Sequence, residues 1–141
     1  MSRLTILACG LLLTAGCGSS NIGTVTGTVT MDGEPLKGAM VEFFPKAGGG
    51  ASSGMTNGQG EYELRYSRDV MGAEKGEHLV QIYTGNVTTE EGDYSGARAE
   101  TVPAKYNQES ELSATVSGGS NVLDFDLDSQ GEIIQPLGDT Y

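Results

Sequence analysis

Apolar and polar residues alternate along most of the chain after residue 22, with the period of two that an extended strand produces. The segment 23–31 places Val25, Val29 and Met31 on one face and a row of threonines on the other. The same alternation recurs in six further segments, which cover 39–45, 53–57, 61–66, 78–84, 111–117 and 122–128. The pattern predicts seven short strands, each with one buried and one exposed face.

Turn-forming residues separate these segments. Asp32-Gly33 and Asn57-Gly58 are typical of tight turns, because these residue types adopt positive φ at low cost. Asn57-Gly58 lies between two predicted strands, and we expect it to join them as a hairpin. No segment keeps the helical period of 3.6 over ten residues or more. We therefore expect an all-β fold, a seven-stranded β-sandwich of Greek-key type whose two sheets pack their apolar faces together.

Composition agrees with a single β domain. The chain has 141 residues, 22 of them glycine, with no tryptophan and a formal net charge of −11. We assign the sandwich to 23–128, which is long enough to bury a core, and expect 129–141 to be a loose tail. The segment 85–102 is long, polar and acidic, and is typical of a surface loop. The negative charge argues against nucleic acid as a partner and disfavours anionic lipid surfaces.

The N-terminal residues show the order of features that is typical of an export signal. Arg3 precedes an apolar run from Leu4 to Ala15, which is too short to span a bilayer, and small residues then lead to Cys17. The run resembles the lipobox of bacterial lipoproteins, in which the cysteine is acylated and becomes the first residue of the mature protein. A plain secretory signal is one alternative. Cys9 is a rival lipobox cysteine, although it would leave a very short apolar core.

This resemblance predicts a signal peptide over 1–16 and a lipidated Cys17 with a tether over 17–22. Acylation at one cysteine attaches several chains, which is enough for stable anchoring. The tether reaches at most about 15–20 Å, so the domain should lie close to the membrane. Gly18, in place of aspartate, resembles the outer-membrane sorting pattern. We expect an exported protein, anchored by lipid to an envelope membrane, preferably the outer one, and facing the periplasm or the cell surface.

A second resemblance covers most of 23–127. The segments Val25–Phe43 and Gly54–Leu64 resemble the first and second signatures of carboxypeptidase regulatory-like domains, and Val102–Asn107 extends the match. Small lipoproteins of planctomycete-type bacteria are the most similar group. The resemblance implies a transthyretin-like seven-stranded sandwich. It implies no peptidase activity, because in the enzymes this domain is an accessory to a separate catalytic domain.

Residues with catalytic or metal-binding potential are sparse. His78 is the only histidine, and we interpret it as a solvated residue at a strand edge rather than as part of a zinc site or a catalytic triad. Asp124, Asp126 and Asp128 alternate along the last strand with the spacing that opens an EF-hand loop, but the later ligand positions do not match. These aspartates are either a solvated face that discourages edge pairing or a weak calcium site.

The sequence thus favours a non-enzymatic, membrane-anchored lipoprotein with a structural or protein-interaction role in the cell envelope. Its partner would be an envelope protein or glycan that binds strand edges or the 85–102 loop, and no cofactor is expected. The alternative is a binding module for carbohydrate or another small ligand, for which Tyr83, Tyr94 and Phe44 are the candidate stacking residues. An enzyme is the third possibility, and it would require a deep pocket with convergent polar groups.

Overall fold

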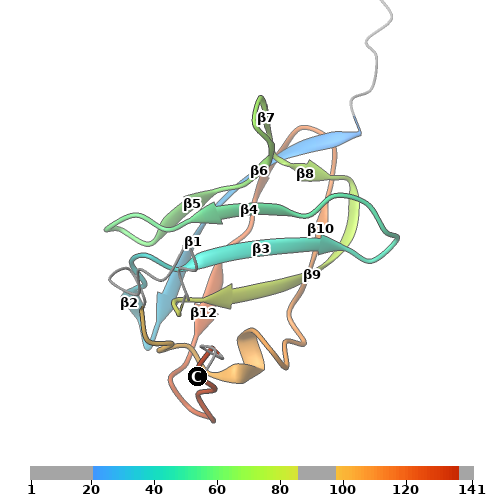
Figure 1. Cartoon of the computed structure of the whole chain (residues 1–141). Helices are drawn as coiled ribbons and strands as arrows, with labels where there is room; N and C mark the ends of the chain where they lie inside the picture. Colours follow the sequence, from blue (N-terminus) through green and yellow to red (C-terminus); the bar gives the residue numbers. More distant parts are fainter. Residues whose placement is uncertain (1–20, 86–97, 137–141) are drawn as a thin grey trace, which may run out of the picture.

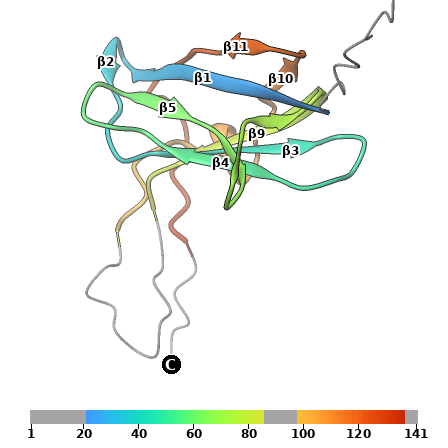
Figure 2. The ribbon, with the colours of Figure 1, turned by 90° about the horizontal axis from the view of Figure 1, so that it is seen from above.

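The computed structural model describes residues 21–85 and 98–136, and these form two facing β-sheets. The first sheet consists of β1 (Ile22–Met31), β2 (Glu34–Pro35), β5 (Glu61–Glu63), β8 (Ala73–Glu74), β11 (Ser120–Val122) and β12 (Phe125–Leu127). The second sheet has the order β10 (Ser113–Val116), β9 (Gly76–Tyr83), β3 (Met40–Pro45), β4 (Ser52–Met55), β6 (Arg65–Ser67) and β7 (Val70–Met71). Figure 2 shows the two layers edge-on. The all-β class and the sandwich are confirmed, with six strands in each sheet.

The strand β1 is the central strand of the first sheet. It pairs antiparallel with β8, β5 and β2 along one edge and parallel with β11 and β12 along the other. Val25 and Val29 are buried on its inner face, as the alternation predicted, and Thr24 and Thr26 are exposed on the outer face. Its ten residues, at about 3.3 Å each, span roughly 33 Å and join the two ends of the sandwich (Figure 1).

The core lies between the sheets and is built from the inward-facing positions of both. Phe43 of β3 meets Phe125 of β12 edge to face, with ring centroids 6.1 Å apart, and the centroid of the Tyr62 ring lies 6.3 Å from that of Phe125. Aromatic pairs of this kind add to the stabilisation that comes from burying their apolar area. The remaining buried hydrophobic side chains of this cluster are Val25, Val29, Ala39, Val41, Leu64, Ala73, Val80, Ile82, Val102, Val116 and Leu127.

The turn at Asn57 is present, but the predicted hairpin is wrong. The strand before the turn, β4, belongs to the second sheet and β5, after it, to the first, so the turn carries the chain across the sandwich. The Asn57 side chain accepts hydrogen bonds from the Gln59 and Glu61 backbone N–H groups, at 3.0 Å each. The positive φ falls at Gly60 (76°), where a Cβ would lie 2.5 Å from the Val29 carbonyl oxygen. Tertiary contact, which a dipeptide does not encode, decides which strands pair.

Two predicted strands are each split between partners. The segment 61–66 divides at Leu64, so that β5 pairs with β1 and β6 with β4. The segment 122–128 is interrupted at Leu123 and Asp124, between β11 and β12. In contrast, the Asp32-Gly33 turn is confirmed, since both residues have positive φ (51° and 83°) and join β1 to β2 as a hairpin.

The described part of the C-terminal segment, as far as Pro136, is attached to the sandwich. The Ala104 N–H, at the start of the 3₁₀ turn η2 (Ala104–Tyr106), donates to the Glu132 carbonyl at 2.7 Å. The side chain of Gln135 bonds both the N–H and the C=O of Glu100, at 2.9 and 3.1 Å. The tail is therefore not loose over this part. No helix within the described ranges is long and apolar enough to cross a membrane.

Candidate functional site

Two of the predicted aspartates lie on the outer face of the first sheet and bond to β1. Asp124 Oδ1 accepts the Thr28 backbone N–H at 2.8 Å, and Asp126 Oδ1 accepts the Thr30 hydroxyl at 2.7 Å. Alternate residues of a strand stand about 7 Å apart, so these carboxylates and that of Asp128 do not converge on one point. Each carboxylate therefore has a structural partner of its own.

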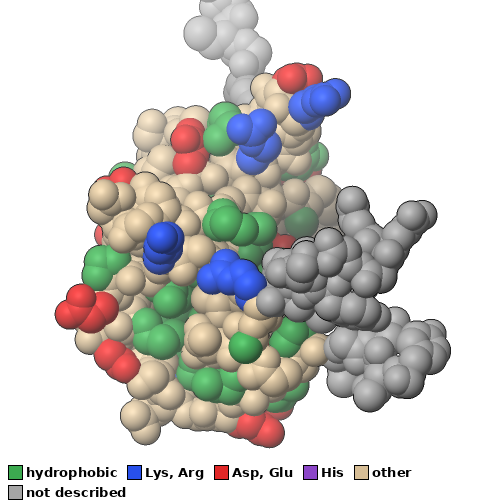
Figure 3. All heavy atoms as spheres, turned by 60° about the vertical axis from the view of Figure 1, so that its left-hand side comes forward, with side chains coloured by type: hydrophobic (Ala, Val, Ile, Leu, Met, Phe, Trp, Pro, Cys, Tyr) green, Lys and Arg blue, Asp and Glu red, His purple; other side chains and the backbone are tan. Residues whose placement is uncertain are grey.

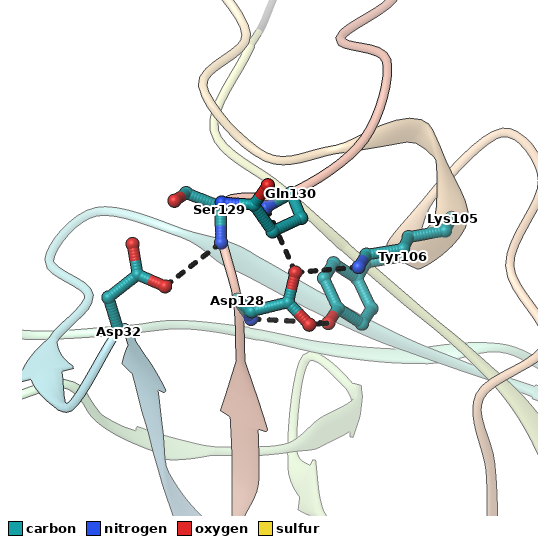
Figure 4. A network of polar contacts seen from close by, with 6 residues as sticks. All are labelled: Asp32, Lys105, Tyr106, Asp128, Ser129 and Gln130. Atoms are coloured by element: carbon teal, nitrogen blue, oxygen red, sulfur yellow. Dashed lines mark hydrogen bonds and ion pairs between the residues drawn. The ribbon is translucent and has the colours of Figure 1, made fainter.

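Asp128 is the centre of a polar network that fastens the end of β12 to η2 (Figure 4). Its Oδ1 accepts from Lys105 Nζ at 2.6 Å and from the Gln130 N–H at 2.9 Å, and its Oδ2 accepts from the Tyr106 hydroxyl at 3.1 Å. The bond to Lys105 lowers the pKa of Asp128, and the same bond raises the pKa of Lys105. Within 21–85 and 98–136, no three His, Cys, Asp or Glu side chains gather as a metal site.

His78 is buried, and its interpretation as a solvated edge residue is wrong. The strand β9 begins at Gly76, so residue 78 falls on the inner face together with Val80 and Ile82. The imidazole Nε2 lies 2.7 Å from the Glu74 carbonyl oxygen, and the ring packs 5.5 Å from Phe43. His78 is a core residue.

Glu100 is a buried carboxylate that the sequence did not indicate, because it lies in the segment expected to be an exposed acidic loop. It is only 6% exposed. Its Oε1 accepts the backbone N–H groups of Thr84, Thr101 and Val102, at 2.8–3.0 Å, and its Oε2 accepts that of Gly85 at 3.1 Å. The carboxylate thus fastens the two ends of this segment together. Nothing in the spacing of residues distinguishes it from the other acidic residues of the segment.

A groove of about 1140 Å³ runs along the side of the sandwich where β5 of the first sheet approaches β4 and β6 of the second. Tyr66, Met55 and Arg65 line it, together with the exposed carboxylate of Glu63. Gly54 allows the sheets to meet at its base, because a Cβ there would lie 2.2 Å from the Glu63 carbonyl oxygen. A ring, thioethers and charged groups around one groove could hold a ligand that has both hydroxyl groups and apolar faces.

The residues proposed for carbohydrate stacking do not line this groove. Tyr83 and Phe44 are half-buried on the outer face of the second sheet, and the register places Met40, not Phe44, opposite Tyr83. They are thus about 13 Å apart along the strands. The Tyr83 hydroxyl donates to Glu42, and burial raises the pKa of Tyr83. Tyr94 and Cys17 lie outside the described residues.

A smaller cavity of about 400 Å³ adjoins Tyr83, between Glu100, Asn107 and the C-terminal residues Ile134 and Pro136. On the face seen in Figure 3, hydrophobic side chains form separate small patches between polar atoms rather than one broad apolar surface. No protein-family model matches the chain, and no curated protein matches it.

Proposed function

We propose that this protein is an exported lipoprotein, anchored to an envelope membrane through acylated Cys17, whose β-sandwich has a non-enzymatic structural or protein-interaction role. The observation that carries the proposal is the position of the domain. Residue 17 ends the lipobox-like run, and β1 begins at Ile22, five residues later. The anchor and the first strand are joined by a segment that reaches at most about 15–20 Å.

The finer fold assignment is part of the same proposal. We infer a transthyretin-like, carboxypeptidase regulatory-like sandwich. The segments that resemble the family signatures contain the Asp32-Gly33 hairpin, the turn at Asn57 and the buried Tyr62. The Tyr62 hydroxyl donates to the Leu123 carbonyl at 2.5 Å, which links β5 to the connection between β11 and β12. Family members are expected to share this use of the tyrosine.

A structural role also accounts for the polar residues that were candidates for chemistry. Asp124, Asp128 and Glu100 each accept backbone hydrogen bonds that hold strands or loops in place. Carboxylates used in this way hold the local backbone in place through charge-assisted hydrogen bonds. These groups therefore favour a scaffold whose binding surface lies on its edges or loops.

Acylation of Cys17 is tested by expressing the full chain in a Gram-negative host. We expect mass spectrometry to find an N-terminus at Cys17 that carries acyl chains, and fractionation to place the protein with membranes. Cys17→Ser should abolish both results. Cys9→Ser is the matched control and should leave both unchanged. Acylation that persists in Cys17→Ser, or is lost in Cys9→Ser, would contradict the proposal.

The groove favours a second candidate function, the binding of an envelope glycan or another hydroxyl-rich ligand. Its volume of about 1140 Å³ is large enough for several sugar rings, and Tyr66 offers a ring for stacking. Titration with a tetramer of N-acetylglucosamine, followed by NMR, tests this function. We expect shifts at Gly54 and Tyr66 that Tyr66→Ala abolishes and Tyr66→Phe retains. Shifts elsewhere, or none, would exclude this ligand class from the groove.

A further inference from the structure

The β6–β7 hairpin projects from the end of the sandwich at which β1 begins (Figure 1). Its root lies against the start of β1, because a Cβ on Gly72 would be 2.2 Å from the Gly23 carbonyl oxygen. The strand β8 follows at once and pairs with β1 through Ala73 and Gly23. The Lys75 N–H donates to the Asn21 carbonyl at 2.9 Å. The hairpin therefore stands beside the point where the N-terminal tether enters the domain.

Charge is distributed unevenly between this end and the rest of the molecule. We call the surface formed by Lys46 and residues 65–77 the anchor end. It carries four basic residues against three acidic ones, a net charge of +1. The remaining described residues carry three basic and twelve acidic ones, a net charge of −9. The overall acidity, which disfavours an anionic lipid surface, is thus absent from the end nearest the tether.

The tip of the hairpin is the turn Arg68-Asp69, whose two exposed side chains carry opposite charges, and apolar surface adjoins it at Val70. Arg68 is exposed and forms no ion pair among the described residues, and its carbonyl accepts from Arg65 Nη1 at 3.0 Å, which holds the turn. Val70 is 38% exposed. Basic, acidic and hydrophobic side chains lie close together at the upper end of the view in Figure 3. This combination suits the bilayer interface, where cations meet phosphates and apolar side chains reach the acyl boundary.

We propose that the β6–β7 hairpin rests on the bilayer that holds the acyl chains of Cys17, with Arg68 at the lipid phosphates and Val70 at the interface. The inference depends on the proposed lipidation. A tether of about 15–20 Å keeps the hairpin at high effective concentration near the bilayer, so that a weak contact is sufficient. The acidic remainder is repelled by anionic headgroups and faces away, which gives the anchored domain one orientation.

A fluorescence experiment tests this orientation, because the chain has no tryptophan of its own. Val70→Trp places a fluorophore on the hairpin, and Ile133→Trp, at a residue 43% exposed in the C-terminal segment, is the matched control. Each full-length, acylated variant is reconstituted in vesicles of phosphatidylethanolamine and phosphatidylglycerol that contain brominated lipid. An interfacial side chain lies close to the brominated acyl chains, so quenching of Val70→Trp should exceed that of Ile133→Trp at least about twofold.

Charge reversal supplies the second arm of the experiment. Arg68→Glu combined with Lys75→Glu should remove most of the excess quenching of Val70→Trp, whereas Lys37→Glu, an exposed residue outside the anchor end, should leave it unchanged. Added salt should weaken the excess through screening. Equal quenching of the two tryptophan variants, in protein that mass spectrometry shows to be acylated and that floats with vesicles, would overturn the orientation but leave the lipoprotein proposal intact. Absence of acylation would overturn both.

Discussion

The two ends of β1 are attached to their neighbouring segments by different kinds of contact. Where β1 begins, beside the anchor end, backbone approaches backbone directly. A Cβ on Gly23 would lie 2.1 Å from the Ser117 carbonyl oxygen, and one on Gly72 would lie 2.2 Å from that of Gly23. At the other end, which we call the distal end, carboxylates join segments that are far apart in sequence. Asp32 accepts the Ser129 N–H at 3.1 Å (Figure 4), and Glu100 fastens the chain after β9 to the segment before η2.

This difference matters for what each end can tolerate. A backbone contact needs residues without side chains, and a substitution there forces strands apart. A network of this kind depends on the carboxylate as the hydrogen-bond acceptor. Loss of the carboxylate leaves buried N–H donors without partners. The anchor end should therefore be sensitive to added atoms, and the distal end to removed ones.

The largest effect is expected at Glu100. Glu100→Ala should lower the free energy of unfolding by about 4 kcal/mol, because four backbone N–H groups lose their acceptor in a buried site. Glu100→Gln keeps the oxygen that accepts three of them and should lose only about 1 kcal/mol. Urea denaturation measures both values. Equal losses in the two variants would show that the network does not hold the distal end.

At the anchor end, Gly72→Ala should cost about 3 kcal/mol, from left-handed backbone strain at φ 113° and from collision with Gly23. Gly76→Ala is the control. Gly76 has a similar φ of 124° but open space around it, so only strain remains and about 1.5 kcal/mol is expected. Thermal unfolding compares them. The contrast between the ends would fail if the two alanine variants were equally stable.

Midway along β1, a close backbone approach and a side-chain hydrogen bond occur together. A Cβ on Gly27 would lie 1.9 Å from the Leu123 carbonyl oxygen, and the Tyr62 hydroxyl donates a hydrogen bond to the same oxygen. Tyr62→Phe should cost about 1 kcal/mol. Burial and, secondarily, the charge of Asp124 raise the pKa of Tyr62. The pKa of Tyr62 in the folded state lies above the unfolded value of about 10. The contribution of the Tyr62 hydroxyl to the free energy of unfolding is therefore complete below pH 10 and is lost as the pH rises further. The wild type should therefore lose stability above pH 10 more steeply than Tyr62→Phe, as stability curves at several pH values would reveal.

The smallest effect is expected at Asp128, because its bonds to Lys105 and Tyr106 are exposed to solvent. The pKa of Asp128 is lowered in the folded state, so its contribution is present above the unfolded pKa of about 4 and is lost as the pH falls through the folded value. Asp128→Asn should shift the Gln130 amide signal in NMR spectra and abolish its acid titration. Asp126→Asn, which alters a bond to the exposed Thr30 hydroxyl, should leave that titration intact.

Short-range features of the fold were predictable. Alternation identified the inner faces of β1, β3 and β9, and the tight turn predicted at Asp32-Gly33 is confirmed because turn formation depends on adjacent residues. The errors involve sequence-distant partners. Asn57 forms its turn, but its flanking strands pair with β3 and β1 rather than with each other. The alternation that marked 78–84 as a strand was right, yet His78 was assigned to the wrong environment because burial depends on the facing sheet.

The candidate site was less predictable than the fold. The regular spacing of the three aspartates is visible in the sequence, but regular spacing on a strand separates side chains rather than gathering them. Glu100 was missed because a single acid in a polar segment has no pattern. Its role comes from the four N–H groups that Thr84, Gly85, Thr101 and Val102 direct at it.

The sequence by itself determined the all-β class and the inward and outward faces of the longer strands, and it carries the proposal of an export signal over 1–16 that is followed by Cys17. These follow from periodicity and from residue types at adjacent positions, which are local properties of a chain. The tertiary structure alone decided which strands pair across the sandwich, that His78 and Glu100 are buried, and that the nearly neutral segment 65–77 lies beside the start of β1. Each of these depends on contacts between segments up to about a hundred residues apart, and no local pattern records them.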